Sequence, residues 1–257
     1  NNMSSKKLML FSLSNSIEYT KKLYPQLSIS RLQTFSDSEF KPDIDESVRG
    51  RRVVICGCLK TMNDVGELLM LADAAKRAGS KEVIAVVTYL PFMRQDRKDT
   101  PRTSIGAKVI ANIIESGYNS INQIITLDLH ASQIEGFFNI PMTHLKGHKM
   151  FCPYIQGKFD MKNIKIISPD AGGAKRAEKF LEELNIPESN YAMIYKVRKE
   201  ANKVESMYLL GEIEGYHAII VDDMVDTAGS LCKAAELLLE KGATGVSACI
   251  THPILSG

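Results

Sequence analysis

The stretch AIIVDDMVDTAGSLCKAAELL (Ala218–Leu238) decides the fold class of this chain. It begins with an apolar run without polar alternation, which is typical of a parallel strand covered on both faces. Two adjacent acids follow, then a turn of small residues, then a helical pattern that begins near Ser230. In open α/β sheets, ligands bind at the carboxyl ends of the strands. The stretch therefore predicts a strand, a binding loop and a helix.

The predicted loop has the groups that a sugar phosphate needs. The amino end of the helix would offer backbone N–H groups to a phosphate, and Thr227 and Ser230 add hydroxyls. Asp222 and Asp223 would suit sugar hydroxyls, or a hard cation that bridges to a phosphate. The plainer alternative is that these acids cap the helix, but a cap needs only one acid and a position closer to the helix.

The same alternation of strand and helix runs through the whole chain. Apolar runs that predict strands lie at residues 7–13, 53–57, 82–90, 123–129, 164–170, 191–196, 217–223 and 245–252. Helical patterns lie at residues 64–79, 104–117 (with Ser104 as N-cap), 174–187 and 230–242. Because the pattern occurs twice, we expect an α/β fold of two domains, residues 6–145 and 146–257, with mainly parallel sheets flanked by helices. The irregular segment 144–163 should hold the boundary.

Composition and charge narrow the class of protein. Apolar residues make up 44% of the 257 residues and charged residues 24%, which is ordinary for a globular protein. The formal net charge of +2 does not favour nucleic acid or an anionic membrane as a partner. The five cysteines are odd in number and scattered, which indicates reduced thiols in a reducing compartment. We therefore expect a soluble cytoplasmic protein.

Several segments resemble class I ribose-phosphate pyrophosphokinases, in the order that this family shows. They are FSDSEF (35–40), SVRG (47–50), RQDRKD (94–99), DLHASQIEGFF (128–138), SPDAGGAKRA (168–177), KVRKEAN (196–202), DDMVDTAGS (222–230) and THPILSG (251–257). The resemblance covers essentially the whole chain. It implies two tandem phosphoribosyltransferase-like domains, one for ATP and one for ribose 5-phosphate. It also implies Mg²⁺-dependent transfer of the diphosphoryl group of ATP to the 1-hydroxyl of ribose 5-phosphate.

The resemblance implies roles for individual residues. The residues that match the ATP contacts are Phe35, Asp37, Glu39, Arg94 and Gln95. Those that match the ribose phosphate site are Asp222, Asp223, Asp226, Thr227, Ala228, Gly229 and Ser230. Those that match the metal site are His130 and Asp170, with Asp128 close by. The catalytic pair matches Lys196 and Arg198. On residue types alone, exposed loops are the favoured interpretation of the segments that hold the ATP-contact residues, and one His with one Asp is a weak metal signal.

Lys196 and Arg198 also have a physical reading of their own. Alternate residues of an extended segment face the same way, so the two cations would lie on one face. Such a pair suits a phosphoryl transition state, where the protein mainly positions groups and stabilises charge. The alternative is an exposed basic end of a strand.

The chain departs from the family pattern at two places. Leu13 stands where a glycine is usual after the first strand. Family members continue for some tens of residues beyond the segment that ends at Gly257, so the second domain is expected to lack its last elements. The family assembles from dimers into hexamers, so we expect a homo-oligomer with the active site between the domains.

Two rival functions remain open at this point. A phosphoribosyltransferase would need one such domain and no ATP site, so FSDSEF and RQD argue against it. A non-catalytic regulatory subunit of the same family would tend to lose active-site residues, whereas Lys196, Arg198, His130 and Asp170 are all present.

Overall fold

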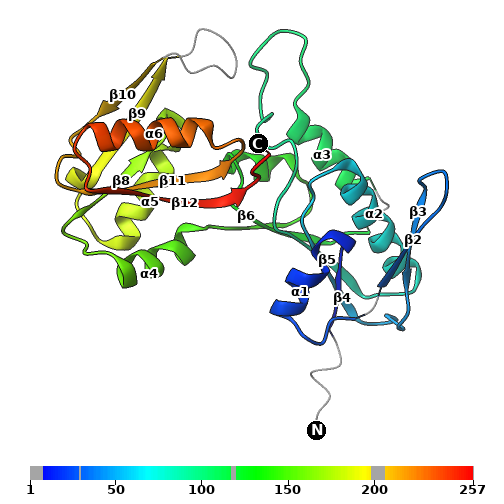
Figure 1. Cartoon of the computed structure of the whole chain (residues 1–257). Helices are drawn as coiled ribbons and strands as arrows, with labels where there is room; N and C mark the ends of the chain where they lie inside the picture. The colour runs from blue at the N-terminus through cyan, green and yellow to red at the C-terminus, as the bar shows by residue number, and fades with distance from the viewer. Residues whose placement is uncertain (1–7, 29, 117–119, 198–205, 257) are drawn as a thin grey trace. The chain divides into compact units, whose positions relative to one another are not determined.

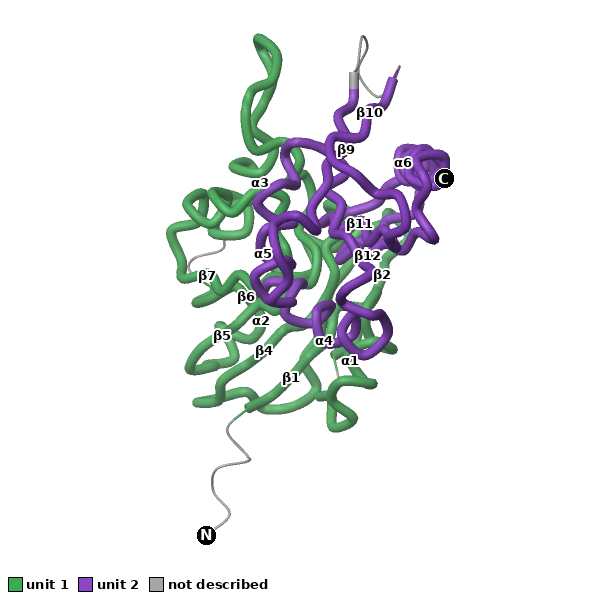
Figure 2. The backbone as a smooth tube through the Cα atoms, turned by 90° about the vertical axis from the view of Figure 1, so that its left-hand side faces the viewer, with its two compact units in different colours: residues 1–145 green, residues 146–257 purple. Residues whose placement is uncertain are grey.

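The structure, a computed structural model, describes residues 8–28, 30–116, 120–197 and 206–256. Its contacts divide the chain into two compact units, residues 1–145 (unit 1) and 146–257 (unit 2), coloured separately in Figure 2. Each unit has its own five-stranded sheet and its own hydrophobic core. The units are therefore described one at a time.

Unit 1 is built on a fully parallel sheet. Its strands, in spatial order, are β1 (Leu8–Ser12), β4 (Arg52–Gly57), β5 (Glu82–Val87), β6 (Gln123–Leu127) and β7 (Met142–Leu145). Its helices are α1 (Ile17–Leu23), α2 (Met62–Arg77) and α3 (Gly106–Glu115), with short 3-10 turns η2 (Ser14–Ser16) and η3 (Ser132–Phe137). A separate antiparallel hairpin consists of β2 (Ser30–Thr34) and β3 (Phe40–Ile44).

Local sequence explains why α2 begins and packs where it does. Thr61 and Asp64 form a reciprocal capping box at its amino end. The apolar stripe that includes Leu68, Leu71 and Ala72 is buried against the sheet, and Lys76 and Arg77 occupy the last turn, where cations favour the helix dipole.

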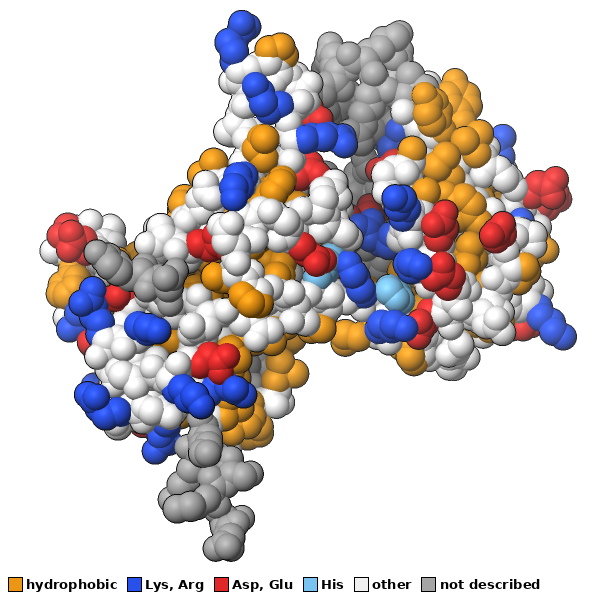
Figure 3. All heavy atoms as spheres, turned by 180° about the vertical axis from the view of Figure 1, so that it is seen from behind, with side chains coloured by type: hydrophobic (Ala, Val, Ile, Leu, Met, Phe, Trp, Pro, Cys, Tyr) orange, Lys and Arg blue, Asp and Glu red, His pale blue; other side chains and the backbone are white. Residues whose placement is uncertain are grey.

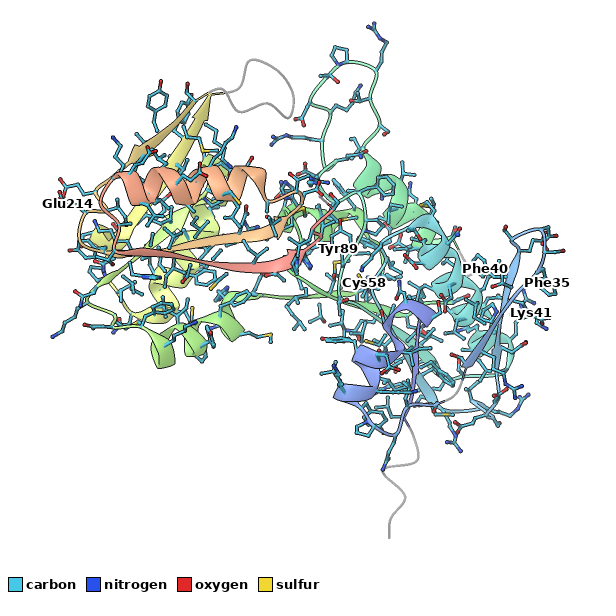
Figure 4. The ribbon with its side chains drawn as sticks, in the orientation of Figure 1. Phe35, Phe40, Lys41, Cys58, Tyr89 and Glu214 are labelled. Carbon is cyan, nitrogen blue, oxygen red and sulfur yellow. The ribbon has the colours of Figure 1, made fainter. Side chains whose placement is uncertain are left out.

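The β2–β3 hairpin attaches to unit 1 through Phe40. A Cβ on Gly66 of α2 would lie 3.0 Å from the Phe40 ring, so the missing side chain makes room for the aromatic ring. Figure 4 shows Phe40 on the side of the hairpin that meets α2, with Phe35 at the tip. The hairpin therefore holds the FSDSEF segment out from the body of unit 1.

Leu13 and Gly57 are packed so closely that each restricts the other. Leu13 is fully buried, and a Cβ on Gly57 would lie 2.5 Å from its Cγ and Cδ1 atoms. Gly57→Ala is therefore expected to lower the free energy of unfolding by about 1–3 kcal/mol, measured by urea denaturation. In a Leu13→Ala background the cost should fall only in part, because the contacts to Cγ and Cδ1 disappear while the Cβ of residue 13 stays 2.7 Å from the added Cβ. Equal costs in the two backgrounds would contradict this account of the contact.

Unit 2 has a mixed sheet. Its strands, in spatial order, are β10 (Ser206–Leu210), β9 (Tyr191–Val197), β8 (Ile164–Ser168), β11 (His217–Val225) and β12 (Gly245–Pro253). All pairings are parallel except β9 with β10. Its helices are α4 (His148–Lys158), α5 (Ala174–Leu184) and α6 (Gly229–Glu240), with 3-10 turns η4 (Ala171–Gly173) and η5 (Glu188–Asn190). Figure 1 shows α4 and α5 on one side of this sheet and α6 on the other, and a core cluster lies on each side.

The structure confirms the predicted α/β fold with mainly parallel sheets, and every apolar run predicted as a strand contains one. Several details of the prediction are wrong. Segment 144–163 contains strand β7 in part and helix α4, which packs through Cys152 and Ile155 although Pro153 lies inside it. Ser104 does not cap α3, because the helix begins at Gly106 and its N-cap position is Ile105.

The surface carries both signs of charge. Figure 3 shows Lys and Arg side chains interspersed with Asp and Glu side chains on the face in view. All five cysteines are free thiols, and Cys56, Cys152 and Cys249 are buried. Among the described residues, no helix is both long enough and apolar enough to cross a membrane.

Candidate functional site

Strand β11 ends at Val225, two residues later than predicted, so Asp222 and Asp223 lie inside the strand and not at its tip. The pairing with β8 ends at Ile220, whereas the pairing with β12 continues to Val225. Beyond Ile220, β11 therefore has a strand neighbour on one side only. Asp223 is buried, with 3% of its surface exposed, and the Asp222 side chain is 27% exposed.

Arg176 of α5 joins the two acids. Its Nη1 atom donates to Asp222 Oδ1 at 3.0 Å, and its Nη2 atom lies 3.2 Å from Asp223 Oδ1. The pKa of Asp222 is raised to about 7: burial contributes most, Asp223 adds to the rise, and Arg176 opposes it. The site therefore holds two adjacent acids in a place that disfavours their full ionisation.

The loop after β11 turns into α6 through a strained residue. Ala228 has φ 62°, in the left-handed region that a residue with a Cβ adopts at a cost of roughly 1 kcal/mol. The N-cap position of α6 is Ala228, which has no side-chain acceptor, so neither Asp222 nor Asp223 occupies the cap position. The amino end of α6 follows a loop of small residues, which is the kind of element that can bind an anion.

Asp226 and the segment after β12 hold this loop in place. The Ser256 hydroxyl donates to Asp226 Oδ1, and Ile254 N–H donates to the carbonyl oxygen of Val225 at 2.9 Å. Thr227, Gly229 and Ser230 are exposed. A Cβ on Gly229 would meet only Thr227 Oγ1, at 3.8 Å, among the described neighbours.

Asp170 and Lys196 meet at the same edge of the unit 2 sheet. Asp170 Oδ1 accepts a hydrogen bond from Gly173 N–H at 3.1 Å, which caps η4, and its Oδ2 atom lies 3.9 Å from Lys196 Nζ. The Lys196 side chain is 9% exposed. A Cβ on Gly173 would lie 2.7 Å from Ser168 Oγ, so this turn requires glycine. Arg198 lies outside the described residues.

The Arg176 contacts predict a pH-dependent loss of stability on substitution. Arg176→Gln leaves the two acids without their cation, which is expected to cost about 3 kcal/mol at about pH 8. The cost should be smaller at about pH 5, where Asp222 is protonated in the folded state. Urea denaturation at both pH values measures this. Arg176→Lys, which keeps the charge but not the two-pronged geometry, should be intermediate. A loss that is the same at both pH values would count against the proposed electrostatic role.

In unit 1, the hairpin tip presents one aromatic ring and two acids to solvent. Phe35 N–H donates to the Glu39 carbonyl at 2.8 Å, and Asp37 Oδ1 accepts from Glu39 N–H at 3.0 Å. Ser38 completes the turn with φ 73°. Phe35, Asp37 and Glu39 are all exposed, so the structure brings these three predicted residues together on one turn.

Arg94 and Gln95 lie on the loop that follows β5. The Gln95 carbonyl accepts from Ala107 N–H at 3.2 Å, and a Cβ on Gly106 would lie 2.6 Å from Gln95 Oε1. The missing side chain at Gly106 therefore lets Gln95 lie against the start of α3. Both Arg94 and Gln95 are exposed.

Asp128 and His130 lie on the loop that follows β6. Asp128 has φ 37°, and Leu129 between them is buried while His130 is exposed. This loop shares the carboxyl edge of the sheet with the ends of β4 and β5, where Leu59 N–H donates to the Tyr89 carbonyl at 3.0 Å. Figure 4 labels Cys58 and Tyr89 at this edge.

The donor groups fit a hard divalent cation that arrives with phosphate. Among the described residues, no three His, Cys, Asp or Glu side chains are grouped closely enough to form a complete metal site. A small hard cation of this kind is usually held by one or two carboxylates together with waters and substrate phosphates. Asp128 in unit 1 and Asp170 in unit 2 each supply one such carboxylate.

Comparisons with known proteins identify the family. Residues 8–117 match the model of the N-terminal domain of ribose phosphate pyrophosphokinase, and residues 146–253 match the phosphoribosyl transferase domain. A ribose-phosphate pyrophosphokinase of Helicobacter hepaticus is 43% identical over an alignment that covers 93% of this chain and 76% of the relative. The chain belongs to the ribose-phosphate pyrophosphokinase family.

Two further relatives support this assignment. A ribose-phosphate pyrophosphokinase of Bacillus subtilis is 41% identical and is matched over 81% of its length, with all of this chain covered. The crystal structure of the phosphoribosylpyrophosphate synthetase of Mycobacterium smegmatis superposes with a TM-score of 0.88 at 31% identity, and the match covers 98% of this chain and 83% of that one. The predicted family and its two-part architecture are thereby confirmed.

Sequence reasoning did not assign a role to Arg176. The sequence feature that could have pointed to Arg176 is its position in the first turn of the helix that follows Asp170 and the two glycines. Only the folded structure shows that this turn faces acids 46 residues further along the chain.

Proposed function

We propose that this chain transfers the diphosphoryl group of ATP to the 1-hydroxyl of ribose 5-phosphate, giving phosphoribosyl pyrophosphate and AMP. The observation that carries the proposal is the arrangement in unit 2. There, Arg176 joins Asp222 and Asp223 beside a loop of small residues and an uncapped helix start. The names of the relatives, ribose-phosphate pyrophosphokinase, describe the same reaction.

Unit 2 would hold the acceptor sugar. The loop Asp226–Ser230, with the first N–H groups of α6, would bind the 5-phosphate, because a helix amino end favours an anion. Asp222 and Asp223 would accept hydrogen bonds from ribose hydroxyls. Arg176 keeps the two acids close together, and so prepares them for a diol before the sugar arrives.

Unit 1 would hold the nucleotide. Phe35 supplies an aromatic surface for the adenine ring, and Asp37 and Glu39 can accept hydrogen bonds from its amino group. Arg94 can bind a phosphate through two N–H groups, and Gln95 beside it adds an amide. The two domain models cover residues 8–117 and 146–253, one in each unit.

In unit 1, the residues proposed to hold Mg²⁺ are His130 and Asp128; in unit 2, Asp170 is proposed as a second magnesium contact. A cation bound at either place would neutralise charge on the phosphates that it contacts. Asp128 and Asp170 supply the oxygen atoms that Mg²⁺ prefers, so they are the stronger candidates. The His130 imidazole would act by orienting a water bound to the cation.

Lys196 and Arg198 are the residues proposed to stabilise the transferring group. In the reaction, the 1-hydroxyl oxygen bonds to the β-phosphorus while the bond from that phosphorus to the bridging oxygen of AMP breaks. The hydroxyl proton leaves to solvent. Cations near the transferring oxygens stabilise the charge that spreads over them in the transition state.

We also propose that the protein is a cytoplasmic homo-oligomer built from dimers, up to a hexamer. The free thiols favour a reducing compartment, and the assembly follows from the family resemblance. Light scattering of the purified protein measures the assembly, and a monomeric mass would exclude it.

Analysis of the nucleotide products tests the proposed function. The protein is incubated with ATP, Mg²⁺ and ribose 5-phosphate, and AMP and ADP are separated and quantified. The proposal expects AMP that depends on the sugar, one for each ATP consumed. ADP would identify an ordinary kinase on this scaffold. Neither product would favour the non-catalytic subunit.

A further inference from the structure

His144 of β7 links the Asp128–His130 loop to a second turn of the chain. Its Nε2 atom accepts a hydrogen bond from Leu129 N–H at 2.8 Å, and its Nδ1 atom lies 2.7 Å from Glu135 Oε1. The His144 side chain is only 4% exposed. One buried imidazole therefore bridges strand β7, the loop after β6 and turn η3.

These partners assign the tautomer of His144. A backbone N–H can only donate, so the Nε2 atom that faces Leu129 carries no proton. In the neutral ring the proton is then on Nδ1, which donates to the Glu135 carboxylate. Glu135 thus keeps the accepting nitrogen of His144 directed at Leu129.

The hydrogen bond from Leu129 N–H to His144 Nε2 also bears on the position of the proposed metal-site residues. Leu129 lies between Asp128 and His130, its side chain is buried, and Asp128 has the strained φ of 37°. A buried N–H group that loses its acceptor is costly, so the loop would rearrange to satisfy it. Such a movement would displace Asp128 and His130 at the same time.

We propose that His144 is a positioning residue for the Mg²⁺–ATP site, acting through the Leu129 N–H group and held in its tautomer by Glu135. The inference rests on the proposed function, because it assigns Asp128 and His130 to that site. His144 itself touches neither substrate in this account. Its effect is to fix the backbone between two residues that do.

Two substitutions separate this role from a general role in packing. The amide of Gln reaches about as far as Nε2 of His, so His144→Gln can still accept from Leu129 N–H. The amide of Asn reaches only to the level of Nδ1, so His144→Asn keeps a donor for Glu135 and loses the acceptor for Leu129. His217→Gln in unit 2 is the matched control, because that imidazole is bonded to Ser247 and packs on Phe159, away from the proposed substrate groups.

The first measurement is amide hydrogen exchange of Leu129 in the substrate-free protein. His144→Asn is expected to speed this exchange by about 10-fold or more, as the loss of one buried hydrogen bond implies, whereas His144→Gln leaves it near the wild-type rate. Unchanged exchange in His144→Asn would overturn the proposed contact. Because no substrate is present, this result stands whatever reaction the protein catalyses.

The second measurement is the affinity for Mg²⁺ with α,β-methylene-ATP, by calorimetry. In this analogue a methylene group replaces the oxygen that bridges the α- and β-phosphorus atoms, so the proposed reaction cannot proceed during the measurement. We expect about 10-fold weaker binding for His144→Asn, near-wild-type binding for His144→Gln and His217→Gln, and no change in the affinity for ribose 5-phosphate. Equal losses for Asn and Gln, or a loss that extends to ribose 5-phosphate, would show a packing role and overturn the proposal. Wild-type binding without AMP formation would instead count against the proposed function.

Discussion

Lys196→Ala is expected to lower kcat by about 100- to 1000-fold, while the KM values for ATP and ribose 5-phosphate change by no more than about threefold. The reason is that a cation near the transferring oxygens contributes most in the transition state, where their charge changes. Steady-state kinetics with each substrate varied in turn measures both constants. A near-normal kcat would remove Lys196 from the catalytic role.

Loss of stability should not account for this effect. The pair that Lys196 makes with Asp170 across 3.9 Å is weak because the Asp170 side chain is 46% exposed. The Lys196 side chain is 9% exposed, so any loss of stability should come from its buried methylene groups, and kcat is measured at a temperature where the variant is folded. The melting temperature of the variant is the control. Lys196→Arg keeps the positive charge but changes its geometry, and it should recover part of the turnover.

Asp222→Asn is expected to lower kcat/KM for ribose 5-phosphate by about 10- to 100-fold, because a hydrogen bond to a charged partner is worth roughly 1.5–3 kcal/mol. The double variant with Asp223→Asn should lose considerably more, since both proposed partners of the ribose hydroxyls are then neutral. The KM for ATP should stay near its wild-type value. If neither constant for ribose 5-phosphate changes, the acids do not bind the sugar.

The same substitution should stabilise the protein at high pH. The pKa of Asp222 in the folded state, raised to about 7 chiefly by burial, lies above its value in the unfolded chain. The folded state therefore keeps a proton that the unfolded chain releases near its ordinary pKa of 3.8, and stability falls as the pH rises from about 4 to about 7. Asp222→Asn has no such titration. It should be more stable than wild type near pH 8, and the difference should shrink steadily as the pH falls toward about 4, as measured by urea denaturation.

Acids at a position where burial disfavours their charge are expected to be present for function and not for stability. A neutral side chain at Asp222 would suit the buried strand better, yet the chain places two acids there and adds Arg176 to hold them. Local rules of sequence and structure are most often broken at functional sites. The strained Ala228 in the adjacent loop is a second such break.

The central elements of unit 2 could be predicted from sequence because their signals are local. The apolar run of β11 and the helical pattern of α6 are each complete within a few residues. The hairpin β2–β3 gave no such signal, because the segment SRLQT is mostly exposed and lacks an apolar face. Helix α4 was missed because Pro153 and two nearby glycines masked a helix that tertiary packing stabilises.

The contacts that organise the candidate site could not be predicted, because they join distant parts of the chain. Arg176 reaches Asp222 across 46 residues, and His144 reaches Leu129 across 15. Arg176 stands in the SPDAGGAKRA segment, but that segment does not indicate which acids its guanidinium contacts, and no sequence pattern distinguishes His144 from an ordinary strand histidine. Their partners become apparent only when strand register and helix orientation are known.

The most direct test of the account is the position at which the diphosphoryl group is attached to the sugar. The reaction with ATP, Mg²⁺ and ribose 5-phosphate is followed by ³¹P NMR. The account predicts a diphosphate ester coupled to the anomeric proton, an intact 5-phosphate and an equal amount of AMP. A new monophosphate ester at a second sugar hydroxyl, or free pyrophosphate with unchanged ribose 5-phosphate, would contradict it.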